Sequence, residues 1–595
     1  MSIEDVILAY QDRLGQIQST LASLQLRQLQ TAVLLSAAIA VFLALAFGAA
    51  SRRVFLLLPV PVAALCIRNY GRRQSALGTL NRLAAFYTRA AARVQGNWAG
   101  EGDSGEEYAA PGHVYAADLT LFGTGSLFER LSVLRTGVGK TKLASFIQEQ
   151  TQSVDESLAR QAAVQELRGR TDLREAIATL GSEFHESSAA TFTEWLDRKP
   201  TRFAPWIRAL ALLTSLITLA CVAPIAVTSV PWSTVATFLI PAAAVQAIFG
   251  LVLRSRVLPI CENSRALSLE LGLIRSGLAL LAQQDFQSPK LRSLVQRITS
   301  DHACGKLRQL QRDLTILSER TKELYYGPSL LVMAGSQAAM GTEAWRIRHR
   351  AEFATWLDAW GEFEALIALA CYAYESPEDT FPVFERQSAI FEAEGLGHPL
   401  LPPGSCVRND ISLSAERHRL LVISGSNMSG KSTLLRSIGL ATVLAGAGAP
   451  VRARSLRLSP FTTCASLSIQ DALQEGKSKF KAEVDRLRET IQLAANRPPV
   501  LFLIDEIFSG TNSRDRRIAA EAVVRTLLKS GALGAVSTHD LALTEIAELP
   551  EMQGANVHMG SRNGSDPLDF DYLLKPGVTT EANALAIARL AGVPV

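Results

Sequence analysis

A glycine-rich loop in the last third of the chain carries the most specific chemistry in the sequence. Its nine residues, with the spacing G-x-x-x-x-G-K-S, are Gly425-Ser426-Asn427-Met428-Ser429-Gly430-Lys431-Ser432-Thr433. An apolar run of strand length precedes the loop, and helix-forming residues follow it. In that setting the loop N–H groups and the helix N-terminus bind phosphates. The pattern predicts an ATP-binding loop, with Lys431 on the β- and γ-phosphates and Ser432 on Mg²⁺.

Two later segments predict the rest of a hydrolytic site. The apolar run 499–504 ends in Asp505 and Glu506, so we expect Asp505 to support Mg²⁺ and Glu506 to orient the attacking water. The short run 536–538 ends at His539, which would sense the γ-phosphate in this context, although a lone histidine is ordinarily a surface or core residue.

Composition indicates that part of the chain lies in lipid. Of the 595 residues, 48% are hydrophobic and only 19% are charged, against about 25% charged residues in soluble proteins. The net charge of +4 does not by itself indicate nucleic-acid binding. The seven cysteines are scattered without a CxxC pair, so neither a zinc site nor a disulfide framework is predicted. The acidic start at Glu4 and Asp5 lacks the basic region of a cleaved signal peptide.

Two apolar blocks predict transmembrane hairpins. In the first, residues 31–50 are uncharged and long enough to span, and residues 54–67 continue after Arg52 and Arg53. The alternative is one span followed by a buried or re-entrant segment. In the second, the uncharged runs 209–227 and 233–253 flank a short turn, and the alternative is an apolar core hairpin of a soluble protein. Four spans place both termini on the cytoplasmic side of a bacterial-type inner membrane.

The order of motifs near the C-terminus resembles the ATPase domain of the MutS DNA mismatch-repair family, a branch of the ABC ATPases. The carrying motifs are Gly397-His398-Pro399-Leu400, Arg408-Asn409-Asp410-Ile411, the loop 425–433, Gly476-x-Ser478-x-Phe480-x-x-Glu483, Asp505-Glu506-Ile507, Gly510-Thr511-Asn512-Ser513 and Ser537-Thr538-His539. Residues 119–122, 131–143 and 160–167 resemble, more faintly, the start of the family's helical core.

This resemblance implies a multidomain chain, in which an α-helical MutS-like core interrupted by transmembrane hairpins precedes a C-terminal α/β P-loop ATPase domain of ABC type. The expected divisions are an N-terminal helical segment 1–28, hairpin 29–70, core region 71–205, hairpin 206–256, core and lever region 257–384, and ATPase domain 385–595.

The resemblance also implies a homodimer in which two ATPase domains sandwich each ATP. Lys431, Ser432, Asp505 and Glu506 would act from one subunit, and the signature loop with Gly476 and Ser478 from the other. His539 would sense the γ-phosphate within its own subunit.

Departures from the family pattern bear on function. Ser426 stands where the family usually has Pro, Ser429 where it has Gly, and Cys406 near the usual place of an aromatic residue against adenine. No mismatch-reading domain precedes the core, so we expect a membrane-anchored member lacking it. Arginines 452, 454 and 457 are expected on a solvated face rather than a phosphate track.

Three functions fit these patterns. The first is a membrane-anchored ATPase whose conformational change acts on mismatched or branched DNA. The second is a membrane ATPase acting on a membrane or protein partner without DNA. The third is a non-hydrolysing ATP-switched scaffold, against which Glu506 argues.

Overall fold

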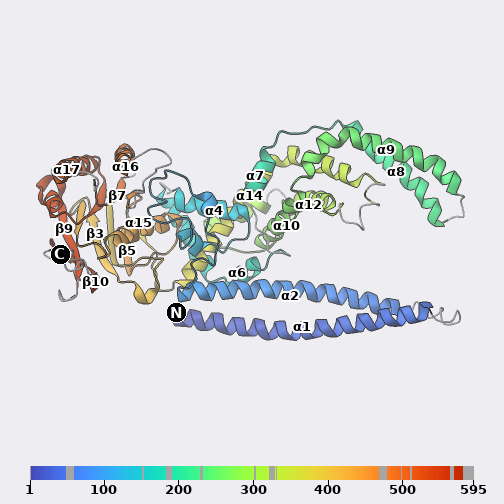
Figure 1. The fold of residues 1–595 in the computed structure, drawn as a ribbon, viewed down its shortest axis with the longest axis horizontal. Coiled ribbons are helices and arrows are strands. Elements are labelled where there is room, and N and C mark those ends of the chain that lie inside the picture. Colours follow the sequence, from blue (N-terminus) through green and yellow to red (C-terminus); the bar gives the residue numbers. More distant parts are fainter. Residues whose placement is uncertain are drawn as a thin grey trace, which may run out of the picture.

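The molecule is elongated, with an α/β domain at one end and long helices extending to the other (Figure 1). The computed structural model describes residues 2–47, 59–149, 153–181, 190–227, 232–299, 303–320, 329, 332–467, 479–496, 499–508, 512–562 and 569–579. A large helical N-terminal region followed by an α/β ATPase domain confirms the coarse fold class expected from sequence.

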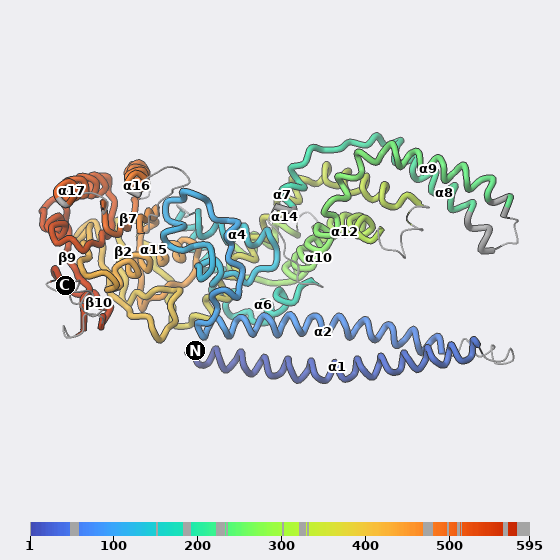
Figure 2. The backbone as a smooth tube through the Cα atoms, in the orientation of Figure 1, coloured from blue at the N-terminus to red at the C-terminus, as the bar shows by residue number. Residues whose placement is uncertain are grey.

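Helices α1 (Ile3–Phe47) and α2 (Pro59–Gln95) lie side by side as one long hairpin (Figure 2). Its base is held by Val6 and Tyr10 of α1 packed with Leu83 and Tyr87 of α2. Pro59 starts α2, a position where its missing N–H is not needed. The divisions expected at residues 28 and 70 fall inside these helices, because helix-forming residues continue through both points.

The second apolar block forms α8 (Pro205–Val227) and α9 (Trp232–Cys261). Both hairpins extend toward the same end of the molecule, away from the α/β domain (Figure 1). Within the described residues, α1 and the part of α9 from Ala236 to Cys261 are long and apolar enough to cross a membrane, and the apolar helix Pro205–Cys221 is shorter. The four spans expected from sequence are therefore not shown.

The remaining helices surround α14 (Ala334–Glu375), which is about 63 Å long at about 1.5 Å per residue. They are α3 (Leu127–Leu131), α4 (Gly137–Gln148), α5 (Val154–Arg168), α6 (Thr171–Ala178), α7 (Ala190–Asp197), α10 (Ser264–Leu281), α11 (Pro289–Thr299) and α12 (Ala303–Glu319). Trp356, Trp360 and Phe363 of α14 are buried in this core. At its N-terminal end, Gln337 donates to the Ser215 hydroxyl of α8 at 3.1 Å.

The α/β domain contains two sheets. The larger has the order β10-β9-β4-β8-β7-β6, parallel except for β10. Its strands are β4 (Leu420–Ser424), β6 (Thr462–Ser466), β7 (Val500–Asp505), β8 (Leu533–Thr538), β9 (Gly554–Ser561) and β10 (Phe570–Pro576). The smaller sheet, in spatial order, is β1 (Val383–Phe384), β5 (Ser455–Leu458), β2 (Ile390–Leu396) and β3 (Asn409–Ser414). The helices α15 (Lys431–Ala447), α16 (Lys479–Ala494) and α17 (Ser513–Lys529) complete the domain.

The central strands of the larger sheet are buried along their length, as parallel strands covered on both faces usually are. Their register places Ser424 beside Thr538 and Asp505 beside Ser537. The carboxyl ends of β4, β7 and β8 therefore meet at one edge, where open α/β sheets bind their ligands.

Candidate nucleotide-binding site

The glycine-rich loop joins β4 to α15, and no other residue type fits at Gly425 and Gly430 without strain. Gly425 has φ of 152°, and a Cβ there would lie 2.4 Å from the carbonyl oxygen of Met559. Gly430 has φ of 100° immediately before α15, in the left-handed region that favours glycine. Close packing against β9 and the turn into the helix thus account for both residues.

Lys431, at the first position of α15, folds back over the loop. Its ammonium donates to the carbonyls of Gly425 at 2.9 Å and Ser426 at 2.8 Å. Burial lowers the pKa of Lys431, and the carboxylates of Asp505 and Glu506 oppose that shift. The lysine is a buried cation within the curve of the loop, as a phosphate-binding lysine must be.

Asp505 is the point where three elements meet. Its carboxylate accepts a hydrogen bond from the Ser432 hydroxyl of α15 and another from the Ser537 hydroxyl of β8. Carboxylate and hydroxyl oxygens are the hard ligands that Mg²⁺ prefers. Ser432 and Asp505 therefore fit the magnesium site expected from sequence, and Ser537 orients the carboxylate, a role that sequence reasoning did not assign.

Glu506 and His539 face each other at the ends of adjacent strands. Nδ1 of His539 lies 2.9 Å from Oε1 of Glu506, and both side chains are partly exposed. Glu506 has a positive φ of 52°, and its N–H donates to the carbonyl of Ser537 at 3.1 Å. Left-handed backbone in a non-glycine residue is uncommon, and here it re-aims the side chain as the strand ends.

Side chains of α16 hold the segment that follows Glu506. The buried carboxylate of Glu483 accepts a hydrogen bond from the N–H of Phe508, and the rings of Phe480 and Phe508 lie 6.1 Å apart. Arg516 of α17 donates to the Phe508 carbonyl at 3.1 Å. The sequence marks Glu483 only as part of a family motif, and this hydrogen bond gives it a structural role.

An aromatic ring lies against the loop from β10. A Cβ on Gly430 would come within 3.0 Å of a Tyr572 ring carbon, and that side chain is partly exposed. Asn409 holds this strand, donating to the Tyr572 carbonyl at 3.0 Å and accepting from the Leu574 N–H at 2.7 Å. Cys406 instead accepts from the His398 N–H at 3.2 Å. Tyr572, from a strand distant in sequence, thus places an aromatic ring beside the loop.

The remaining expected residues are placed less tightly. Asn427 and Met428 are exposed at the loop tip, Ser429 is buried with its hydroxyl unpartnered among the described residues, and Thr433 lies in the first turn of α15. Gly476 and Ser478 lie outside the described residues. The fold thus brings the loop, Asp505, Glu506 and His539 together at one edge of the larger sheet.

Comparison with known proteins now identifies the domain. The family model described as MutS domain V matches residues 421–595. These residues are a MutS-family ATPase domain, an ATP hydrolase. A DNA mismatch repair protein MutS from Lactobacillus delbrueckii subsp. bulgaricus is 33% identical over 241 residues, covering 39% of this chain and 28% of that protein. An endonuclease MutS2 from Thermus thermophilus is 35% identical over 219 residues, covering 36% of this chain and 27% of that protein. The chain thus spans under a third of the length of these relatives.

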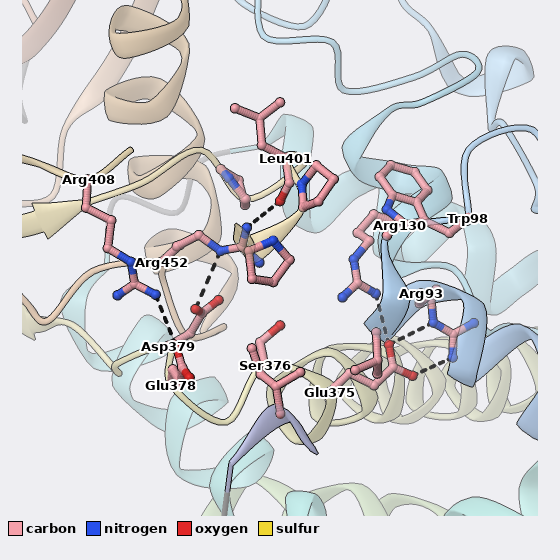
Figure 3. Close-up of a pocket in the computed structure, with 16 residues that line it drawn as sticks. Arg93, Trp98, Arg130, Glu375, Ser376, Glu378, Asp379, Leu401, Arg408 and Arg452 are labelled. Atoms are coloured by element: carbon pink, nitrogen blue, oxygen red, sulfur yellow. Dashed lines mark hydrogen bonds and ion pairs between the residues drawn. The ribbon is translucent and has the colours of Figure 1, made fainter. Parts of the chain in front are cut away.

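A buried ion-pair junction connects the MutS-type domain to the helical region (Figure 3). Glu375, at the end of α14, binds Arg93 of α2 at 2.6 Å and Arg130 of α3 at 2.9 Å. Nearby, Arg452 is buried beside Asp379 at 3.7 Å. Burial alone would raise the pKa of Glu375, but the arginines outweigh it and hold the pKa below its ordinary value. Glu375 therefore joins the first hairpin to the helical core, and Arg452 joins the ATPase domain to the segment after α14, through ion pairs that are almost fully buried.

Arg452 corrects the expectation of a solvated arginine face. Arg454 and Arg457 are exposed, but Arg452 is buried and donates to the Leu401 and His398 carbonyls as well as pairing with Asp379. The short β5 strand starts only at Ser455, so the alternating pattern assumed for these three residues does not extend back to Arg452.

Proposed function

We propose that this protein is a membrane-anchored ATP hydrolase that converts ATP turnover into a change of conformation in its helical region. The observation that carries the proposal is the assembly of Lys431, Ser432, Asp505 and Glu506 at the edge of the parallel sheet. No other arrangement in the described residues combines a phosphate-binding loop with a paired carboxylate and a water-facing glutamate.

Each side chain then has a defined task. Lys431 and the loop N–H groups hold the β- and γ-phosphates, and Ser432 and Asp505 hold the metal. Bound Mg²⁺ would neutralise charge that develops on the phosphate oxygens. Glu506 orients the attacking water, and His539, 2.9 Å from Glu506, fixes the carboxylate and faces the γ-phosphate. Tyr572 offers its ring as a stacking surface for the base.

Two further parts of the proposal rest on the family resemblance and on the apolar hairpins, respectively. A homodimer would complete each site with Gly476 and Ser478 of the partner subunit's signature loop, because these groups act in trans in the family pattern. The two hairpins would anchor the chain in a bacterial-type inner membrane, with the ATPase domain in the cytoplasm. The common direction of the hairpins supports anchoring from one side (Figure 2).

Two kinds of molecule are candidates for the partner on which this ATPase acts. The names of the relatives, DNA mismatch repair protein and endonuclease, favour mismatched or branched DNA. The apolar hairpins, both of which contact α14, favour a membrane or protein partner without DNA. We propose DNA as the ligand because the similar proteins are named for acting on DNA. The alternative, which the apolar surface of this molecule favours, is a partner in the membrane.

The test uses the full chain purified in detergent and in lipid nanodiscs. ATP hydrolysis is measured for the wild type and Glu506→Gln, with Arg454→Gln, an exposed position of the ATPase domain, as control. We expect at least a hundredfold loss for Glu506→Gln and no change for the control. Wild-type turnover in Glu506→Gln would refute the hydrolytic assignment. Duplex, mismatched and branched DNA are then added, and a rate that responds to none of them excludes DNA as the partner.

A further inference from the structure

Two long segments that include most of both hairpins carry positive charge and no negative charge. Residues 13–100 contain ten arginines and no acidic residue, and residues 198–261 contain six lysines and arginines and no acidic residue. The whole chain has a net charge of only +4, so the remainder is net negative. These two segments contain the helices that carry the apolar surface, together with a few residues next to them.

Five of these arginines form what we call the arginine collar, and they are Arg27, Arg72, Arg73, Arg254 and Arg256. Two other arginines of the first hairpin form ion pairs within the chain, Arg13 with Glu175 and Arg93 with Glu375. The collar forms no ion pair within the part of the chain that the structure describes. Four of its members are exposed, and Arg73 donates to the Arg27 carbonyl and the Thr31 hydroxyl, which sets α1 and α2 in register there.

The collar lies at one depth along the hairpins. From Arg27 to Phe47, the last described residue of α1, is 20 positions, or about 30 Å of helix. From Trp232, the first residue of α9, to Arg254 is 22 positions, or about 33 Å. The hydrocarbon core of a bilayer is about 30 Å thick. In α1 and α9 the arginine-bearing surface thus begins about one bilayer thickness from the described end of the helix, whereas α2 carries a further exposed arginine, Arg68, nearer its own end.

The side chains between the collar and the tips are those that lipid would cover. Leu34, Val41 and Phe42 of α1 and Ile248 and Leu251 of α9 are exposed. A nucleic acid could neutralise the arginines, but it has no surface that matches this adjoining apolar zone. A phospholipid matches both, because its acyl chains cover the apolar zone and its phosphate meets the guanidinium groups.

We propose that the arginine collar binds the phosphate groups of anionic phospholipids in the leaflet that faces the ATPase domain. The inference rests on the membrane anchoring proposed above and adds the lipid class that the anchor selects. Attraction of a juxtamembrane arginine to an anionic surface strengthens binding about fivefold per residue. Removing two arginines should therefore lower the preference for anionic lipid at least tenfold.

The test measures how strongly the full chain prefers phosphatidylglycerol over phosphatidylcholine. The protein is extracted from nanodiscs with equal amounts of both lipids, and retained lipids are counted by native mass spectrometry. Arg27→Gln/Arg72→Gln and Arg254→Gln/Arg256→Gln each remove two collar charges. The matched control, Arg454→Gln/Arg457→Gln, removes two charges from exposed positions of the ATPase domain.

We expect the wild type and the control to retain phosphatidylglycerol selectively and both collar variants to lose the selectivity, with ATP hydrolysis unchanged in all four proteins. Equal selectivity in the wild type and the collar variants overturns the inference. Binding of a 30-base-pair duplex that the collar substitutions abolish, without lipid selectivity, overturns it in favour of DNA. Release of the wild type from membranes by alkaline carbonate instead removes the proposed anchoring itself, so the two failures are distinguishable.

Discussion

Replacing Glu375 by Gln tests whether the buried ion pairs hold α2 of the first hairpin to α3 and α14 of the helical core. The carboxylate is 1% exposed, and its arginine partners Arg93 and Arg130 are 7% and 4% exposed. The amide keeps the size of the side chain but leaves two buried guanidinium groups without their counter-charge. Removing one partner of such a buried pair costs about 3–5 kcal/mol, whereas an exposed pair is worth about 0–1 kcal/mol.

Hydrogen exchange of the full chain measures this cost where it arises. We expect Glu375→Gln to speed exchange at the C-terminal ends of α2 and α14 by at least a hundredfold, because about 3 kcal/mol of local stability is lost. Arg454→Gln, which breaks the exposed pair with Asp410, serves as control and should change exchange little. The pKa of Glu375 is lowered in the fold, so wild-type protection should be full above its ordinary value of 4.5 and fall as the pH drops through the lower folded value.

The reasoning is refuted if Glu375→Gln leaves exchange at both helix ends within about threefold of the wild type. That outcome would mean that apolar packing around the junction carries its stability. An Arg93→Met/Glu375→Gln double variant separates the contributions, since coupled residues deviate from additivity. Equal costs for the single and double variants would assign the loss to the Arg93 pair.

Three further expectations concern single side chains. Burial raises the pKa of Glu364 to about 7, with Thr136 and Arg135 opposing, so it holds its proton in the fold at pH values where the unfolded chain loses it. The free energy of unfolding should therefore fall by about 3 kcal/mol as pH rises from about 4.5 to about 7, and Glu364→Gln should remove that slope in unfolding measured at pH 5 and 8. Ser537→Ala, which removes a hydrogen bond to Asp505, should raise the Mg²⁺ concentration for half-maximal hydrolysis about tenfold, and an unchanged Mg²⁺ titration would contradict its positioning role. Ser429→Ala removes a buried, unpartnered hydroxyl and should raise the free energy of unfolding by about 1 kcal/mol, whereas weaker ATP binding without that gain would show that the hydroxyl contacts the nucleotide.

The catalytic elements were predictable because each lies at a strand end with its own local pattern. The loop 425–433, the Asp505-Glu506 pair and His539 are each recognisable within a few residues, and the parallel sheet brings their strand ends together. Tyr572 was not predictable, because its place beside Gly430 depends on β10 pairing antiparallel with β9.

Long-range ion pairs were hidden from the sequence for a similar reason. Arg93 and Glu375 are 282 residues apart, and neither belongs to a periodic pattern that would mark it as buried. The spacing of Arg452, Arg454 and Arg457 suggests one alternating strand, but β5 begins only at Ser455, after Arg452. Hydropathy located both apolar hairpins, and the helical pattern expected for residues 1–28 agrees with α1. The sequence still placed divisions at residues 28 and 70, where α1 and α2 continue without a break, because polar helix-forming residues extend a helix without raising hydropathy.

The length of α14 would amplify a small rotation at one end of the helix into a large displacement at the other. One end of this helix is fixed by Glu375 beside the ATPase domain, and the other is bonded to Ser215 in the middle of α8, within the second hairpin. Over about 63 Å of unbroken helix, a tilt of about 5° at one end displaces the other by about 5 Å, close to one helical turn. An angular change too small to disturb the nucleotide site would therefore become, at the hairpin, a shift as large as the spacing between successive rows of packed side chains.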